Sequence, residues 1–275
     1  MNVIVAIDSL KGSLSSLQAG AAAKAGILRA IPAATVSVKP VADGGEGTVT
    51  ALVSGLSGES VTIPVTGPLG ETVEATYGIL PDYTAVIEMA EAAGLPLVPA
   101  EKRNPMITTT YGVGEMILHA LDEGCRSFII GIGGSATNDG GTGMLRALGC
   151  RFRKADGSEI ALGAQELSEL ATIETEALDP RLKESHFSIA CDVINPLCGS
   201  SGASYIFAPQ KGADPATVRK LATALAHLAD MTAVTLGTDL RDQPGAGAAM
   251  NFMWIRMYWY PDRIRKHLWS PLLNA

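Results

Sequence analysis

The sequence predicts an α/β fold in which strands and helices alternate. Three short apolar runs, at residues 3–7, 35–41 and 128–130, each lead through a segment rich in glycine, acidic and hydroxyl residues into a helical pattern. Such runs are too short for buried helices and have the β-branched character of core strands. We therefore expect strands that end at glycine-rich turns, where open α/β sheets place their ligands.

Length and composition place the chain among globular proteins. Its 275 residues are 47% hydrophobic and 18% charged, far from the disordered class. A net charge of −7 gives no basic footprint for nucleic acid, and no apolar run approaches transmembrane length. The four cysteines lack metal-type pairing, and the N-terminus lacks the basic region of a secretory signal. We expect a cytoplasmic protein without nucleic-acid or membrane partners.

A polar segment follows the first predicted strand directly. It contains Asp8, Ser9 and Lys11. A carboxylate, a hydroxyl and an ammonium group at the carboxyl end of a strand favour a ligand site. The alternative is that Asp8 and Ser13 only cap the helix predicted over residues 14–31, with Lys11 solvated.

The second strand leads into a shorter glycine-rich turn. Here Asp43 and Glu46 flank Gly44 and Gly45, where backbone without side chains can approach a ligand closely. Asp43 is therefore a candidate ligand-binding residue. Alternatively, Asp43 caps the next helix and Glu46 is its capping-box partner, which also fits the spacing.

Three strand-like runs then break the alternation of strand and helix. Residues 60–65 and 71–80 predict an antiparallel hairpin, and residues 84–89 predict a further strand. Successive strands of this kind predict a second subdomain inserted into the first. Glu88 and Glu91, where the third run ends, are interpreted as solvated charges.

The stretch SFIIGIGGSATNDGGTGMLRALG, which starts at Ser127, is the most informative. It predicts a strand, a glycine-rich turn and a helix whose first turn lies close to other backbone. Unpaired N–H groups and the positive end of a helix dipole suit a phosphate or a carboxylate. The spacing matches neither the dinucleotide motif nor the P-loop, and the glycines could serve only tight helix packing.

A further short apolar run, at residues 187–191, is closed by Asp192, again at the predicted carboxyl edge of a sheet. The loop that follows, through Gly199 and Lys211, is long enough to be a binding loop rather than a connector. An amphipathic helix then begins near Asp214.

Five unusual motifs occur in order between Met1 and about Ala249: VAIDSLKGSLSS, PVADGGEGT, GIGGSATNDGGTGMLRALG, CDVINPLCG and FAPQKGA. With them the chain resembles the bacterial class I glycerate kinases. The resemblance implies ATP- and Mg²⁺-dependent phosphoryl transfer to a hydroxyl of D-glycerate, giving 2-phosphoglycerate. It also implies two α/β domains with the active site in the cleft between them.

The implied reaction suggests roles for the polar residues at the strand ends. Lys11 would neutralise charge, and either Asp8 or Asp192 would act as the base. Asp43, Asp139 and Asp192 are candidates for contact with Mg²⁺. The candidates for binding substrate or phosphate are Ser9, Asp43, Gly44, Gly45, Glu46, Gly133, Gly134, Ser135 and Asn138.

The expected architecture is a Rossmann- or flavodoxin-like three-layer domain with a second, inserted α/β domain. Residues 1–60 and 112–250 are assigned to the lobes with the Rossmann-like core, and residues 61–111 to the start of the insert. Residues 251–275 form an atypical tail.

This tail departs from the family pattern, because it is basic and contains all three tryptophans of the chain. We expect an altered C-terminus, an incomplete cleft, exposure of part of the first domain, lowered stability and a tendency to associate. Alternatively, the tail is an amphipathic segment that packs on the body or on a partner. A homo-oligomer, an interaction component and a relative that binds nucleotide or a hydroxy acid without turnover also remain open.

Overall fold

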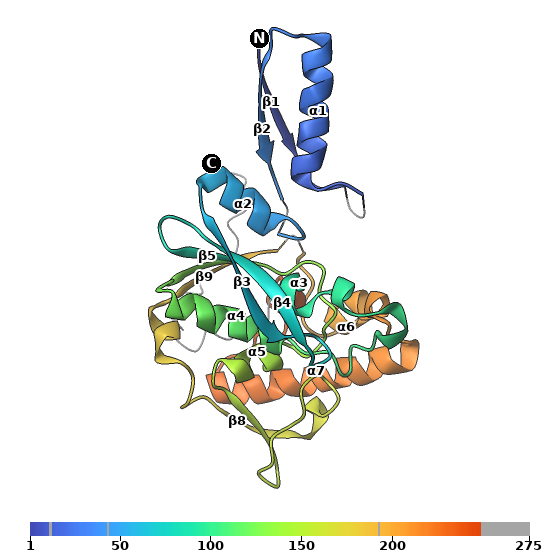
Figure 1. The fold of residues 1–275 in the computed structure, drawn as a ribbon. Coiled ribbons are helices and arrows are strands. Elements are labelled where there is room, and N and C mark those ends of the chain that lie inside the picture. Colours follow the sequence, from blue (N-terminus) through green and yellow to red (C-terminus); the bar gives the residue numbers. More distant parts are fainter. Residues whose placement is uncertain (11–12, 43, 192, 249–275) are drawn as a thin grey trace.

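The structure of this chain, a computed structural model, describes residues 1–10, 13–42, 44–191 and 193–248. Those residues form sheets of two, five and two strands (Figure 1). The strands are β1 (Asn2–Ile7), β2 (Thr35–Pro40), β3 (Glu59–Thr66), β4 (Thr72–Ile79), β5 (Thr84–Glu88), β6 (Ser127–Gly131), β7 (Arg151–Lys154), β8 (Leu170–Glu174) and β9 (His186–Ala190). Two of the sheets contain parallel pairs, so the predicted α/β class is confirmed.

Helices connect and cover these strands. The α-helices are α1 (Ser16–Ala30), α2 (Thr48–Leu56), α3 (Ala90–Ala93), α4 (Tyr111–Asp122), α5 (Thr142–Ala147), α6 (Ala203–Phe207) and α7 (Pro215–Leu236). The short 3-10 helices are η1 (Leu95–Leu97), η2 (Ala100–Lys102), η3 (Leu167–Glu169), η4 (Pro180–Glu184) and η5 (Pro209–Lys211). In the described part of the chain, no helix has the length and apolar character needed to cross a membrane.

The first sheet is a parallel pair, β1 and β2, which stands apart from the rest of the molecule together with α1 (Figure 1). α1 begins with a capping box, in which Ser15 and Gln18 exchange hydrogen bonds between side chain and backbone. The alternative in which Asp8 and Ser13 cap this helix is therefore wrong. The helix starts later than that alternative requires.

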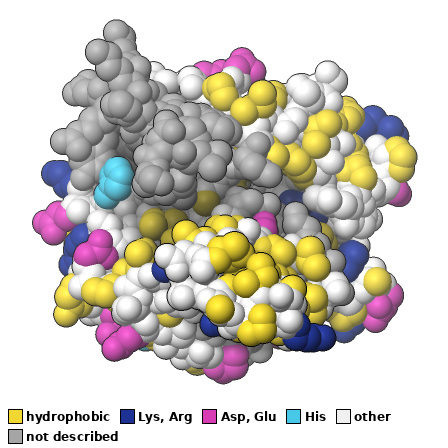
Figure 2. Space-filling model, turned by 90° about the horizontal axis from the view of Figure 1, so that it is seen from above, with side chains coloured by type: hydrophobic (Ala, Val, Ile, Leu, Met, Phe, Trp, Pro, Cys, Tyr) yellow, Lys and Arg dark blue, Asp and Glu magenta, His cyan; other side chains and the backbone are white. Residues whose placement is uncertain are grey.

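The first sheet is also thinly covered. Residues of β1 alternate between exposed and half-buried, and Ile4 is 72% exposed. Parallel strands are normally buried on both faces, so the exposure of β1 is unusual for a parallel pair. It agrees with the predicted exposure of part of the first domain, whose bounds stay a prediction. Figure 2 views the molecule from above and shows hydrophobic side chains toward the middle of this face, with charged side chains mainly around its rim. Lowered stability and self-association stay predictions.

The second sheet has the strand order β3-β4-β5-β6-β9. β3 and β4 form the predicted antiparallel hairpin, in which Gly67 N–H donates to the carbonyl oxygen of Glu71 at 2.6 Å. β5, β6 and β9 are parallel, and their register places Ala85 opposite Phe128. This sheet joins strands of the expected insert to strands of the expected core, and the predicted domain boundaries stay a prediction.

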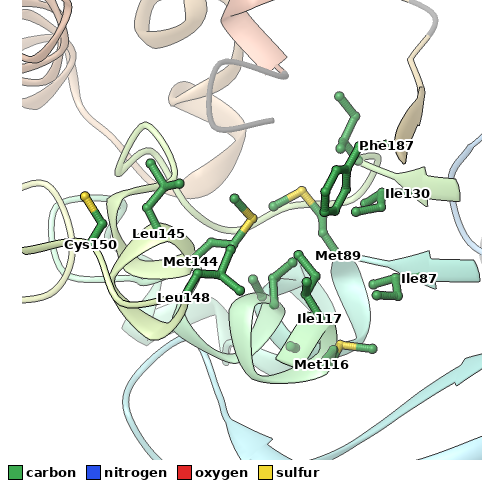
Figure 3. Packing of buried hydrophobic residues seen from close by; sticks show 14 of the residues in the cluster. Ile87, Met89, Met116, Ile117, Ile130, Met144, Leu145, Leu148, Cys150 and Phe187 are labelled. Atoms are coloured by element: carbon green, nitrogen blue, oxygen red, sulfur yellow. The ribbon is translucent and has the colours of Figure 1, made fainter. Parts of the chain in front are cut away.

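The main hydrophobic core lies against the parallel part of this sheet (Figure 3). Ile87, Ile130 and Phe187 come from β5, β6 and β9, and Met116 of α4 belongs to the same cluster. The ring of Phe187 stacks on that of Phe128, with centroids 4.7 Å apart. Because close-packed interiors tolerate little movement, this core fixes the carboxyl ends of the three strands.

Candidate functional site

A pocket of about 400 Å³ lies at the carboxyl ends of β5, β6 and β9. It is lined by the residues that directly follow these strands, which are Met89, Ile132 and Cys191. The turn after β2 contributes a second wall, and side chains from α6, η5 and α7 contribute a third. The sequence predicted ligand-binding groups at this edge of the sheet.

Close contact between two glycine-rich turns builds one side of the pocket. A Cβ atom on Gly131 would overlap the carbonyl oxygen of Gly44, and a Cβ atom on Gly44 would lie 2.7 Å from the carbonyl oxygen of Ala190. On Gly133, a Cβ atom would lie 2.9 Å from the Cα of Gly45. Such distances exclude side chains, so glycine is required where these turns meet. The sequence predicted such a close approach for the first turn of the following helix. A Cβ atom on Gly143 there would lie 2.8 Å from the backbone nitrogen of Tyr111, so this prediction is confirmed.

Many of the predicted binding residues line the pocket. These are Gly44, Gly45, Glu46, Gly133, Gly134, Ser135, Asn138 and Asp139. Asp8 and Ser9 lie at the carboxyl end of β1, where Ser9 N–H donates to Asp8 at 2.6 Å, and they are not among the described lining residues. Lys11, Asp43 and Asp192 lie outside the described residues.

Asp139 is the acceptor at the centre of the glycine-rich segment. It is 1% exposed, and its Oδ2 accepts hydrogen bonds from Thr110 N–H at 2.9 Å, from Thr110 Oγ1 at 2.8 Å and from Gly143 N–H at 3.3 Å. Its Oδ1 accepts one from Gly141 N–H at 3.0 Å. Burial raises the pKa of Asp139, and these donors oppose the rise by favouring the carboxylate.

This arrangement corrects the interpretation of the helix start. The sequence predicted that this glycine-rich turn presents unpaired N–H groups to a ligand. Next to α5 that prediction is wrong, because the N–H groups of Gly141 and Gly143 donate to the chain's own carboxylate. For the turn at Gly133, Gly134 and Ser135 it stays a prediction. The donors at this end of the segment therefore position the turn.

The same hydrogen bonds bear on the predicted Mg²⁺ ligands. Four donors already occupy the two oxygens of Asp139, so its carboxylate fits a direct metal contact poorly. Among the residues that the structure describes, no cluster of three or more histidine, cysteine, aspartate or glutamate side chains could hold a metal ion. The metal assignments for Asp43, Asp139 and Asp192 stay predictions.

Lys211 is a pocket residue that belongs to the predicted binding loop but was not among the predicted site residues. It is 7% exposed, and its ammonium group donates to Ser135 Oγ at 2.9 Å and to the carbonyl oxygen of Thr137. Burial lowers the pKa of Lys211 to about 8, and the charge of Asp139 opposes the shift. The available signals were its place in the FAPQKGA motif and in the loop that the sequence predicted to be a binding loop.

Glu88 was interpreted as a solvated charge, and that interpretation is wrong. The residue is 6% exposed, and its carboxylate accepts hydrogen bonds from Val49 N–H at 2.7 Å and from Gly47 N–H at 3.2 Å. α2 begins at Thr48 without a side-chain cap of its own, so the proposed capping box of Asp43 and Glu46 is also wrong. Glu88 instead ties the second turn to the end of β5, while burial raises its pKa.

Comparisons with known proteins agree on one group. The family described as the glycerate kinase family matches residues 3–250. The glycerate kinase of Haemophilus influenzae is 51% identical over 90% of this chain and 66% of its own length. The glycerate 2-kinase of Escherichia coli is likewise 51% identical over 90% of this chain and 66% of its own.

A solved structure gives the same result. A glycerate kinase 2 structure from Salmonella typhimurium LT2 has a TM-score of 0.85 and 48% identity, and covers 94% of this chain and 70% of that one. The chain spans about two thirds of the length of the curated relatives that it matches.

Proposed function

The chain belongs to the glycerate kinase family, and from this premise we propose that it transfers a phosphoryl group from ATP to a hydroxyl of D-glycerate, giving 2-phosphoglycerate. The observation that supports this most directly is the pocket. Residues of four of the five family motifs meet there, although they lie far apart in the sequence. A cytoplasmic location and a homo-oligomeric state remain expectations.

Phosphoryl transfer requires positioning of the reactants and neutralisation of charge. The N–H groups of Gly134 and Ser135 donate to no described residue, and the Ser135 hydroxyl lies beside them on the pocket wall. We assign these donors to anionic oxygens of the ligand. Lys11 keeps its predicted role of neutralising charge.

The proton of the reacting hydroxyl needs an acceptor. Of the two predicted bases, Asp8 directly follows β1 and is not among the described residues that line the pocket. Asp192 lies outside the described residues, but its sequence neighbours Cys191 and Val193 line the pocket. This favours Asp192 as the base.

When bound with the nucleotide, Mg²⁺ would supply positive charge that offsets the charge of the phosphates. Asp139 fits a direct contact with it poorly, and Asp43 and Asp192 are the remaining predicted ligands. Asp139 is better suited to a positioning role, because it holds the start of α5 against the loop at Thr110.

A kinase assay tests the proposal. The purified chain is incubated with D-glycerate, ATP and Mg²⁺, beside the same chain carrying Lys11→Met, and the product is identified by phosphorus NMR. We expect 2-phosphoglycerate from the unmodified chain and a loss of orders of magnitude in the variant. A folded chain that binds ATP or D-glycerate without forming product would instead be a binding protein.

A further inference from the structure

We infer that Lys211 is the pocket's receptor for an oxyanion of the ligand, either a phosphate of the nucleotide or the carboxylate of the hydroxy acid. The inference rests on the proposed function only in the choice of these two ligands. The mechanism predicted from the sequence gives Lys211 no role, because Lys11 is the residue expected to neutralise charge.

The geometry provides the first argument. Lys211 ends η5, between α6 and α7, and lines the same pocket as the turn after β2. An ammonium group carries three donors. Two of them reach Ser135 Oγ and the carbonyl oxygen of Thr137. For the third, the described residues offer no acceptor, so a ligand in the pocket can supply it.

The charges around the ammonium group provide the second argument. The charged side chains that line the described pocket are those of Glu46, Asp139 and Lys211. Asp139 acts on Lys211 through its charge, but its oxygens are bound to four other donors, and the two residues form no ion pair within the described chain. A buried cation without a paired carboxylate is costly, and a ligand oxyanion would offset that cost.

A purely structural role is the competing explanation. Lys211 would then serve only to hold Ser135 and Thr137 in place. Under that explanation its replacement lowers stability, while a variant that folds keeps its affinity for anions. Affinity therefore separates the two roles more directly than turnover.

The test measures binding of pyrophosphate, ATP and D-glycerate by calorimetry to the full chain and to three variants. Because a charge-assisted hydrogen bond is lost, Lys211→Met should weaken at least one probe by about ten- to a hundredfold. Lys211→Arg keeps the charge and should recover part of the affinity. Lys220→Met, which removes an exposed lysine from α7, is the control and should bind like the unmodified chain.

The probes also identify the source of the oxyanion. Weaker binding of pyrophosphate and ATP assigns Lys211 to the donor phosphates, whereas weaker binding of D-glycerate alone assigns it to the acceptor carboxylate. Either result supports the inference, even if the chain transfers no phosphoryl group and the proposed function fails.

Two results would overturn the inference. One is equal affinity of the unmodified chain and of folded Lys211→Met for all three probes. The other is an unmodified chain that binds none of them. If the Met variant does not fold, the same affinities are measured for Lys211→Gln, which keeps a donor toward Ser135.

Discussion

Replacing Asp139 by asparagine tests whether the buried carboxylate organises the pocket. The asparagine oxygen can keep the three donors at the Oδ2 position, but its amide group then faces Gly141 N–H. Losing one charge-assisted hydrogen bond and weakening three others costs roughly 4–6 kcal/mol. Burying a neutral amide in place of a carboxylate returns part of this cost, since burial disfavours the charged form of Asp139. We expect a net destabilisation of about 2–4 kcal/mol.

Thermal unfolding followed by circular dichroism measures this change. For a chain of this size, the expected loss corresponds to a fall in Tm of roughly 5–15 °C. Asp156→Asn is the matched control, because Asp156 lies in an exposed turn and accepts its hydrogen bonds from nearby Ser158, so its Tm should change little. An Asp139→Asn variant with the Tm of the unmodified chain would refute the reasoning that this carboxylate holds the loop and α5 together.

Three further predictions concern the pocket and its supports. Glu88→Gln should destabilise the chain by about 1–3 kcal/mol and speed hydrogen exchange at the start of α2; unchanged exchange there would contradict the capping role. Gly131→Ala should lower both stability and ATP affinity, because the added methyl overlaps backbone of the turn after β2, whereas Gly26→Ala meets no atom within 4 Å and should be neutral or slightly stabilising. Affinity for whichever of ATP and D-glycerate Lys211 contacts should fall as pH rises above about 8, where Lys211 loses its proton, and a pH profile identical to that of Lys211→Arg would argue against this.

The same shift of Lys211 has a separate consequence for stability. Its pKa in the folded chain, about 8, lies below the ordinary lysine value of 10.5. Between these values the unfolded chain binds more protons than the folded chain. The contribution of this group to the free energy of unfolding therefore increases as pH rises through that range, in the absence of ligand. Stability of the free protein and affinity for anions should thus respond to pH in opposite directions.

Local patterns in the sequence were sufficient for most of the described strands and for the turns that follow them, but β7 and β8 were not predicted. β1, β2 and β6 were predicted from short β-branched runs, and the hairpin of β3 and β4 from the glycine and proline between its strands. These signals lie within a few residues of one another, because backbone preferences act over that range. The glycines marked these turns for the same reason, but the sequence did not show which backbone atoms they approach.

Only the tertiary structure decided which residues far apart in the sequence form hydrogen bonds with each other. Glu88 and Val49 are separated by 39 residues, and Lys211 and Ser135 by 76. A carboxylate from β5 replaced the local cap that the spacing of Asp43 and Glu46 predicted. Which side chain satisfies a buried N–H group depends on what packing brings near it.

The sequence by itself therefore determined the α/β class, the family to which the chain is similar and the edge of the sheet where a ligand would bind. Only the tertiary structure decided how Asp139, Glu88 and Lys211 are used. All three are charged groups in an interior of low dielectric, where a buried charge persists only beside groups that compensate it. Those groups are assembled by folding.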